Sequence, residues 1–209
     1  MAVRANPRPY YLAALEALDH ELGRLLAALD TKTRANTVII FIGDNGTPSR
    51  VVQPPYSRQT AKGSLYPGGI HVPMVIAGKG VERRGERESA LVDTTDLFAT
   101  IANLAGVARA PGSDSVSFVS LLAGTRSSGR NFAYADLDAD QPKMMARNSG
   151  WTVRDATHQF VSLKSGKRLL FDLSADPGGE DDLLKHGNAV ALDTAGRLET
   201  LGRTLRESR

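Results

Sequence analysis

Asp44 and Asn45 are the first residues whose types suggest chemistry. They follow the apolar run 37–42 and precede Gly46. A carboxylate beside an amide oxygen suits a hard cation such as Ca²⁺ or Mg²⁺. The sequence Asp-Asn-Gly is also typical of a tight turn that binds nothing. Taken alone, the turn is the simpler explanation.

Lys62 and His71 are the next candidates. Lys62 follows Asp44 by 18 residues, in a stretch rich in Gly, Pro and Ser, and its ammonium group could bind an anionic oxygen. A surface lysine and a structural histidine are the plain alternatives. The four histidines show no metal-ligand spacing, and the absence of cysteine excludes disulfides, thiolate metal sites and a cysteine nucleophile within this chain. No phosphate-binding loop, dinucleotide fingerprint or nucleophile elbow is present.

The elements that must position these residues suggest an α/β organisation. Leucines at three- and four-residue steps predict an amphipathic helix over 10–29. The run 37–42 predicts a strand buried on both faces, the pattern of a parallel sheet. Asp44 would then lie at the carboxyl end of that strand, where open α/β sheets bind ligands. Further along, we expect a strand over 72–77, a short strand at 90–92, and a helix that is capped within 93–95, runs through Leu97 to Ala105 and ends at Gly106.

The second part of the chain has a different pattern. Short strands are predicted at 131–135, 151–154, 158–163 and 168–173, and a helix at 188–206. Together they predict a small antiparallel sheet with a helix packed on it. We expect a boundary between two units, 1–125 and 126–209.

Charge and hydropathy exclude some functions. The 26 Lys and Arg against 23 Asp and Glu give a net charge of only +3, spread over both halves, so nucleic acid is a poor candidate partner. The start of the sequence has no apolar signal region, and no apolar run approaches the roughly 20 residues of a membrane helix. We therefore expect no signal peptide and no membrane partner, and the compartment stays open.

Several segments in order resemble one known family. They are LDHELGRLLAAL, NTVIIFIGDNG, AKGSLYPGGIHVPMVIAG, LVDTTDLFATIANLAGV and RLLFDLSADP. From about Tyr10 to the last helix, the chain is similar to the C-terminal half of a sulfatase of the alkaline-phosphatase superfamily. The resemblance implies part of a three-layer α/β/α sandwich, followed by a small antiparallel sheet and a C-terminal helix.

The resemblance also implies roles for the candidate residues. Sulfatases hydrolyse sulfate esters with a hydrated formylglycine, made from Cys or Ser in a Cys/Ser-x-Pro-x-Arg motif, and a divalent cation, commonly Ca²⁺ and alternatively Mg²⁺. Asp44 and Asn45 match the C-terminal pair of metal ligands. Lys62 matches the lysine that contacts the sulfate and stabilises charge on the leaving side. His71 stands where arginine is usual and is a weaker candidate for substrate contact.

The departures from the family pattern are specific. The chain has no cysteine and no Ser-x-Pro-x-Arg, so the formylglycine nucleophile and the first pair of aspartate ligands have no counterpart in it. Pro67 stands where glutamate is usual. We expect the chain alone to be inactive and to bind Ca²⁺ weakly or not at all, because Ca²⁺ takes about 6–8 oxygen ligands.

Three functions follow from these observations. The chain could be a sulfatase portion (a fragment, a split subunit or a truncated product), a related phosphatase or phosphodiesterase, or a non-catalytic binding or interaction protein derived from the fold. A complete enzyme would act on a sulfate-ester small molecule or glycan, whose identity the fold does not fix. Because the strand at 37–42 would otherwise have an unpaired edge, we expect a marginally stable chain, self-association or an N-terminal-half polypeptide as partner.

Overall fold

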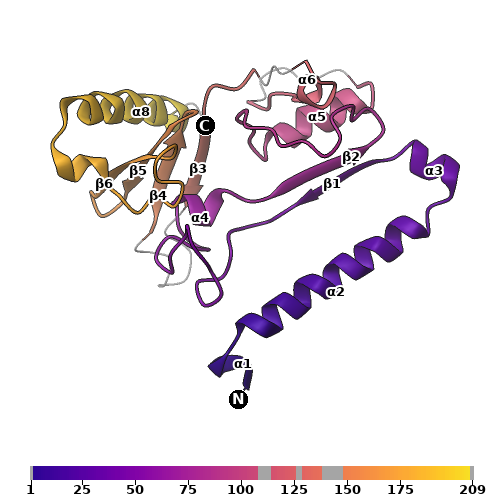
Figure 1. The fold of residues 1–209 in the computed structure, drawn as a ribbon. Helices are drawn as coiled ribbons and strands as arrows, with labels where there is room; N and C mark the ends of the chain where they lie inside the picture. Colours follow the sequence, from indigo (N-terminus) through magenta and orange to yellow (C-terminus); the bar gives the residue numbers. More distant parts are fainter. Residues whose placement is uncertain (1, 108–113, 126–128, 138–147, 208–209) are drawn as a thin grey trace.

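The computed structural model describes residues 2–107, 114–125, 129–137 and 148–207. These residues form a two-stranded antiparallel ribbon, a separate four-stranded sheet and helices that flank both (Figure 1). The mixed α/β class predicted from the sequence is therefore present. The expected boundary between 1–125 and 126–209 stays a prediction.

The C-terminal sheet is antiparallel throughout, with the order β3-β4-β5-β6. Its strands closely match the predicted ones: Ala133–Leu137, Gly150–Arg154, His158–Leu163 and Arg168–Asp172. Helix α8, Ala189–Glu207, covers one face of this sheet (Figure 1). The prediction of a small antiparallel sheet with a packed helix is confirmed.

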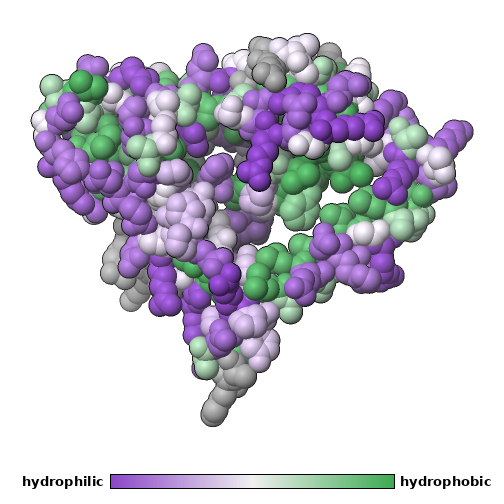
Figure 2. Space-filling model, in the orientation of Figure 1, coloured by the Kyte–Doolittle hydropathy of each residue, from purple (hydrophilic) through white to green (hydrophobic). Residues whose placement is uncertain are grey.

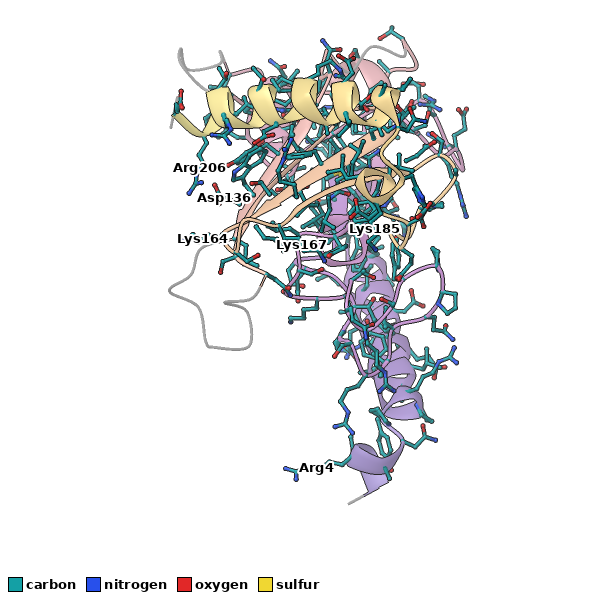
Figure 3. The ribbon with its side chains drawn as sticks, turned by 90° about the vertical axis from the view of Figure 1, so that its left-hand side faces the viewer. Arg4, Asp136, Lys164, Lys167, Lys185 and Arg206 are labelled. Carbon is teal, nitrogen blue, oxygen red and sulfur yellow. The ribbon has the colours of Figure 1, made fainter. Side chains whose placement is uncertain are left out.

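The contact between α8 and the sheet forms the main core. Leu198, fully buried on α8, packs with Trp151, Val153 and Phe160 of the sheet. Gly202 brings α8 close to the sheet, because a Cβ atom there would overlap the ring of Trp151. At the rim, Arg206 Nε lies 3.9 Å from Asp136 Oδ2 (Figure 3).

The other face of the same sheet is covered by the long segment that follows β1. Leu65 is buried there, and it forms a second apolar cluster with residues of β5 and β6: Val161, Leu163, Leu169 and Phe171. The short helix α4, Pro67–Ile70, continues this segment. A loop from the first part of the sequence and α8 from its end therefore enclose one sheet.

The N-terminal part is far more open. Helix α1, Ala2–Ala5, is followed by α2, Arg8–Ala27, and α3, Thr31–Ala35. Helix α2 has no buried residue, although the sequence predicted an amphipathic helix in this region. Figure 2 shows hydrophobic residues along the hollow between α2 and the strands. The exposed large hydrophobic residues of α2 are Tyr10, Leu12, Leu15, Leu18 and Leu25.

The strand predicted at 37–42 forms as β1, Val38–Ile42, but its surroundings differ from the expectation. It pairs antiparallel with β2, Met74–Gly78, from Val38 opposite Gly78 to Ile42 opposite Met74. Burial on both faces is wrong for the described residues, because β1 is only partly buried and Phe41 is exposed. An apolar run shows what a strand is able to bury, whereas neighbouring elements decide what it does bury.

Helix α5, Asp96–Leu104, packs with the short helix α6, Val119–Leu122. The fully buried Asp96 accepts hydrogen bonds from Arg130 Nε at 2.6 Å and Val116 N at 2.7 Å. The short strand expected at 90–92 is wrong. Glu88 Oε1 accepts from the backbone N–H groups of Ser89 and Ala90, so the backbone before that position is satisfied locally.

In the part of the chain that the structure describes, no helix combines the length and the apolar character needed to cross a membrane.

Candidate functional site

The β1–β2 ribbon continues beyond its regular strands and carries Asp44 and Asn45. Gly43 N donates to Pro73 O at 2.9 Å, and Gly46 N donates to Gly69 O at 3.1 Å. The first bond continues the β1–β2 register past Ile42 and Met74, whereas the second lies one residue out of that register. Backbone hydrogen bonds therefore hold the Asp-Asn-Gly sequence against a second segment. A free surface turn would make no such bonds.

Lys62 is brought to the same place by a backbone contact. Its N–H donates to Thr47 O at 3.0 Å, three residues after Asp44. The Lys62 side chain is exposed, so its ammonium group is available to a ligand. The residues singled out from the sequence therefore meet in one neighbourhood, although 18 residues separate Asp44 from Lys62.

Close packing of glycines makes this meeting possible. A Cβ atom at Gly46 would overlap the carbonyl oxygen of Gly68 and lie 2.8 Å from Gly69 Cα. A Cβ atom at Gly69 would overlap the carbonyl oxygen of Ser64. Neither glycine has a left-handed backbone, so the requirement comes from the approach of two chain segments.

The C-terminal sheet fixes the backbone on the other side of Lys62. Gln159 of β5 is 1% exposed, and its Nε2 donates to Leu65 O at 2.7 Å and to Thr152 Oγ1 at 2.9 Å. Asn148 Nδ2 donates to Gly63 O at 3.1 Å. Two side-chain amides from the sheet region thus hold the backbone on the C-terminal side of Lys62.

Two buried side-chain oxygens among the described residues have no hydrogen-bond partner: Asn45 Oδ1 and Ser64 Oγ. Such atoms are uncommon in native proteins and call for an explanation. Both belong to the segments joined by the Gly46–Gly69 hydrogen bond. A buried amide oxygen without a donor, next to the carboxylate of Asp44, fits a cation ligand.

Asp44 and Asn45 by themselves would not complete a metal site. The described ranges hold no group of three or more His, Cys, Asp or Glu side chains that could bind a metal ion. Asp44 is exposed and Asn45 is half-buried. A complete Ca²⁺ site needs more oxygens than this pair provides.

His71 lies at the edge of the site. Its Nδ1 is 3.5 Å from the hydroxyl oxygen of Tyr56. The residue as a whole is exposed, yet desolvation of the ring lowers its pKa, and the positive charge of Arg154 lowers it further. Pro67, in place of the usual glutamate, is buried at the start of α4. It packs against Gly179, because a Cβ atom added at Gly179 would lie only 2.8 Å from Pro67 Cδ.

The sequence did not identify Tyr56, Ser64, Asn148, Arg154 or Gln159 as residues of this neighbourhood. Gln159 carried a usable signal, because it is a polar residue next to the apolar pair Phe160 and Val161 in a predicted strand. A buried polar side chain needs a hydrogen-bond partner, and its partners here come from 94 residues earlier and from a neighbouring strand. For the others, only the tertiary structure reveals the contact.

Comparison with known proteins identifies the family. The sulfatase family model matches residues 3–107, which include β1, the Asp-Asn-Gly sequence and Lys62. The chain belongs to the sulfatase family. Arylsulfatase K of Danio rerio is 30% identical over 175 residues, and that of Gallus gallus is 28% identical over 213 residues. These alignments cover 82% and 95% of this chain but 32% and 36% of the relatives, so the chain spans about a third of their length.

Solved structures show that the whole described architecture is sulfatase-like. A putative sulfatase from Bacteroides thetaiotaomicron superposes with a TM-score of 0.72 at 22% identity, covering 95% of this chain and 43% of that one. BT4656, in complex with its substrate D-glucosamine-2-N,6-O-disulfate, gives 0.79 at 20% identity, covering 95% and 40%. A phosphonate monoester hydrolase from Silicibacter pomeroyi gives 0.70 at 22%, covering 90% and 38%. The fold is therefore alkaline-phosphatase-like, and the sheet with α8 is part of it.

Proposed function

We propose that this chain is the portion of a sulfatase that supplies two metal ligands, Asp44 and Asn45, and a sulfate-binding lysine, Lys62. Membership of the sulfatase family supports a sulfuric ester hydrolase. The observation that carries the assignment is the buried, unpartnered Asn45 Oδ1 next to Asp44, on the segment whose Thr47 binds the Lys62 backbone.

The roles follow from the chemistry of the groups. Asp44 and Asn45 would provide two oxygens to a Ca²⁺ or Mg²⁺ ion, which when bound polarises the nucleophile and a sulfate oxygen. The Lys62 ammonium, exposed on a loop held at both ends, would bind a sulfate oxygen and stabilise charge that develops on the leaving side. The nucleophile is absent from this sequence, which has neither cysteine nor Ser-x-Pro-x-Arg. Hydrolysis therefore requires a polypeptide portion that carries it.

The open N-terminal surface supports a partner for this portion. Exposed apolar side chains lie on α2, on the ribbon and on α5, among them Leu25, Phe41, Val75 and Phe98. Among the described residues, β1 pairs along one edge only, with β2. We propose that the N-terminal half of a sulfatase domain, in the same polypeptide or a separate one, covers this surface and pairs with β1. Self-association of the chain is the alternative.

The reaction class is tested by combining this chain with a polypeptide that carries Cys/Ser-x-Pro-x-Arg and an Asp-Asp pair. Activity on an aryl sulfate is expected with both and with neither alone, and Lys62→Ala should abolish most of it. Lys32→Ala, an exposed lysine of α3, is the matched control. Activity on an aryl phosphate or phosphonate, with none on the aryl sulfate, would favour a related phosphatase. A combined sample that hydrolyses none of these esters would support a non-catalytic binding protein.

Metal binding is tested separately by calorimetry. The chain alone is expected to bind Ca²⁺ weakly or not at all, and addition of the N-terminal portion should create a site that Asp44→Ala and Asn45→Ala weaken. A sub-micromolar Ca²⁺ isotherm for the chain alone would contradict the assignment of Asp44 and Asn45 as half of a shared site.

A further inference from the structure

The pair Asn45-Gly46 has a chemical reactivity that the candidate metal role does not use. It is the only Asn-Gly pair among the 209 residues. Glycine has no side chain to shield its backbone nitrogen, so this nitrogen can approach the side-chain amide carbon of a preceding asparagine more closely than other residues allow. Asn45 is therefore the asparagine of this chain most prone to attack by the backbone that follows it.

The reaction is a deamidation that consumes one water molecule and needs no oxidant or reductant. The backbone nitrogen of Gly46 loses its proton and bonds to Asn45 Cγ, the Cγ–Nδ2 bond breaks, and the side-chain nitrogen leaves as ammonia. A five-membered succinimide ring then joins the two residues. Water opens this ring at Cγ to give aspartate, or at the backbone carbonyl carbon to give isoaspartate.

The folded chain restrains both partners of this reaction. Gly46 N donates its proton to Gly69 O at 3.1 Å, so the attacking nitrogen is engaged elsewhere. Gly46 is buried, and a Cβ atom there would lie 2.8 Å from Gly69 Cα, which leaves its backbone little room to rotate. Asn45 Oδ1 is buried without a hydrogen-bond donor. Negative charge that develops on this oxygen during the attack would therefore be left unstabilised.

Local opening removes these restraints. The ribbon that carries Asn45 is only partly buried, and the neighbouring Asp44 is exposed. Segments with few buried apolar contacts open at a lower free energy than a packed core does. When the contact between Gly46 and Gly69 opens, the Gly46 nitrogen loses its acceptor and water reaches the Asn45 side chain.

We propose that Asn45 is a site of spontaneous deamidation, and that opening of the Gly46–Gly69 contact sets its rate. The product carries an additional negative charge beside Asp44. The isoaspartate form also adds one methylene carbon to the backbone, which displaces Gly46 from its position against Gly69. The inference is independent of the proposed function. If Asn45 does bind a metal ion, deamidation changes one of its ligands.

The test follows deamidation by peptide mass spectrometry in the full 209-residue chain, incubated at mildly alkaline pH in buffer and in urea. In urea, Asn45 should react fastest of the seven asparagines, because it alone precedes a glycine. In buffer, its rate should fall at least about tenfold, because the attack then requires local opening of a packed segment. In water enriched in oxygen-18, the new carboxylate should carry the label.

A substitution that loosens the contact should raise the rate without altering the reacting pair. Gly69→Ala places Cβ against the carbonyl oxygen of Ser64 and displaces the acceptor of the Gly46 N–H. It should accelerate deamidation of Asn45 in buffer by about fivefold or more and leave the rate in urea unchanged. Gly196→Ala, on α8 with open space around it, is the matched control and should change neither rate.

A second measurement keeps the test decisive if Gly69→Ala does not fold. In the unaltered chain, hydrogen exchange of the Gly46 amide and deamidation of Asn45 should rise in parallel as urea is added below the unfolding transition, because both require the same opening. Equal Asn45 rates in buffer and urea, or no reaction at Asn45 in urea, would overturn the proposal. Exchange that rises without deamidation, or a folded Gly69→Ala variant with an unchanged rate, would do the same.

Discussion

The two sheets of this molecule differ in how completely they are covered. The C-terminal sheet has α8 on one face and the segment around Leu65 on the other, and Val153, Phe160, Val161 and Leu170 are fully buried. The β1–β2 ribbon is only partly buried, and α2 beside it exposes its leucines. Residues with similar apolar character therefore contribute very differently to stability, because contact with other elements decides how much surface is removed from water.

The residues that stabilise the fold and the candidate metal ligands lie in different regions. The better-packed unit carries the side chains that fix the Lys62 loop, Gln159 and Asn148, whereas the open unit carries Asp44 and Asn45. The candidate site lies where the two meet. On the proposed function, this chain would hold the Lys62 loop by itself, while the β1 edge and the pair Asp44 and Asn45 would need a partner for completion.

The largest expected effect comes from truncating one apolar side chain in each region. Phe160→Ala should lower the free energy of unfolding by about 3–5 kcal/mol, because it leaves a cavity in the main core. Leu25→Ala, at a side chain that is 63% exposed, should change it by less than about 0.5 kcal/mol. Urea denaturation followed by circular dichroism measures both. A comparable loss in the α2 variant would show that this face is covered in solution, and therefore that the chain self-associates.

The junction of the two regions is tested by adding a methyl group. Gly46→Ala places Cβ against the carbonyl oxygen of Gly68 and should cost about 3 kcal/mol, because both segments are backbone and must move apart. Gly23→Ala, in the middle of α2 with open space around it, should instead stabilise the chain by up to about 1 kcal/mol. Thermal melts of the two variants should shift in opposite directions. An unchanged melt for Gly46→Ala would mean that the ribbon extension and the Gly68–Gly69 segment are not packed together.

The hold of the C-terminal sheet on the Lys62 loop is tested at Gln159. Gln159→Leu removes the donor to Leu65 O and Thr152 Oγ1 and should cost about 2 kcal/mol, because buried acceptors lose their partner. Hydrogen exchange of amides in residues 60–66 should accelerate more than exchange in β5 and β6. Gln53→Leu, at an exposed position, is the control. Equal acceleration across the sheet would argue that Gln159 stabilises the fold without a specific effect on the loop.

The smallest expected effect is a pH dependence within the C-terminal unit. Burial acts to raise the pKa of Asp155, but hydrogen bonds from Arg197 and from the backbone of His158 and Thr157 outweigh it and hold the pKa at about 2, below the ordinary 3.8. A carboxyl whose folded pKa is depressed stabilises the fold above its unfolded pKa. This contribution, about 1 kcal/mol after solvent screening, should be complete above about pH 4 and fade towards about pH 2.

Asp155→Asn tests that expectation by removing the titration. Its stability should be lower than that of the unaltered chain at pH 6, and the two should converge as the pH falls towards about 2. Parallel stability curves over this range would contradict the role of the Asp155 carboxylate.

The sequence by itself determined the elements and the candidate residues. Alternation and turn residues predicted the four C-terminal strands, and periodic leucines predicted α2 and α8, because these patterns depend on local geometry. The order of the Asp-Asn-Gly and Lys-Gly-Ser-Leu-Tyr segments indicated a sulfatase, and the absence of cysteine and Ser-x-Pro-x-Arg led to the prediction that the nucleophile lies outside this chain.

Only the tertiary structure decided which surfaces are covered and which side chains meet. The apolar run of β1 predicted burial on both faces, yet its neighbours leave it partly exposed. Gln159 contacts Leu65 across 94 residues, and Asn148 contacts Gly63 across 85 residues. Sequence patterns indicate which residues are able to be buried or to bind. Contacts between segments distant in the sequence depend on how the whole chain folds.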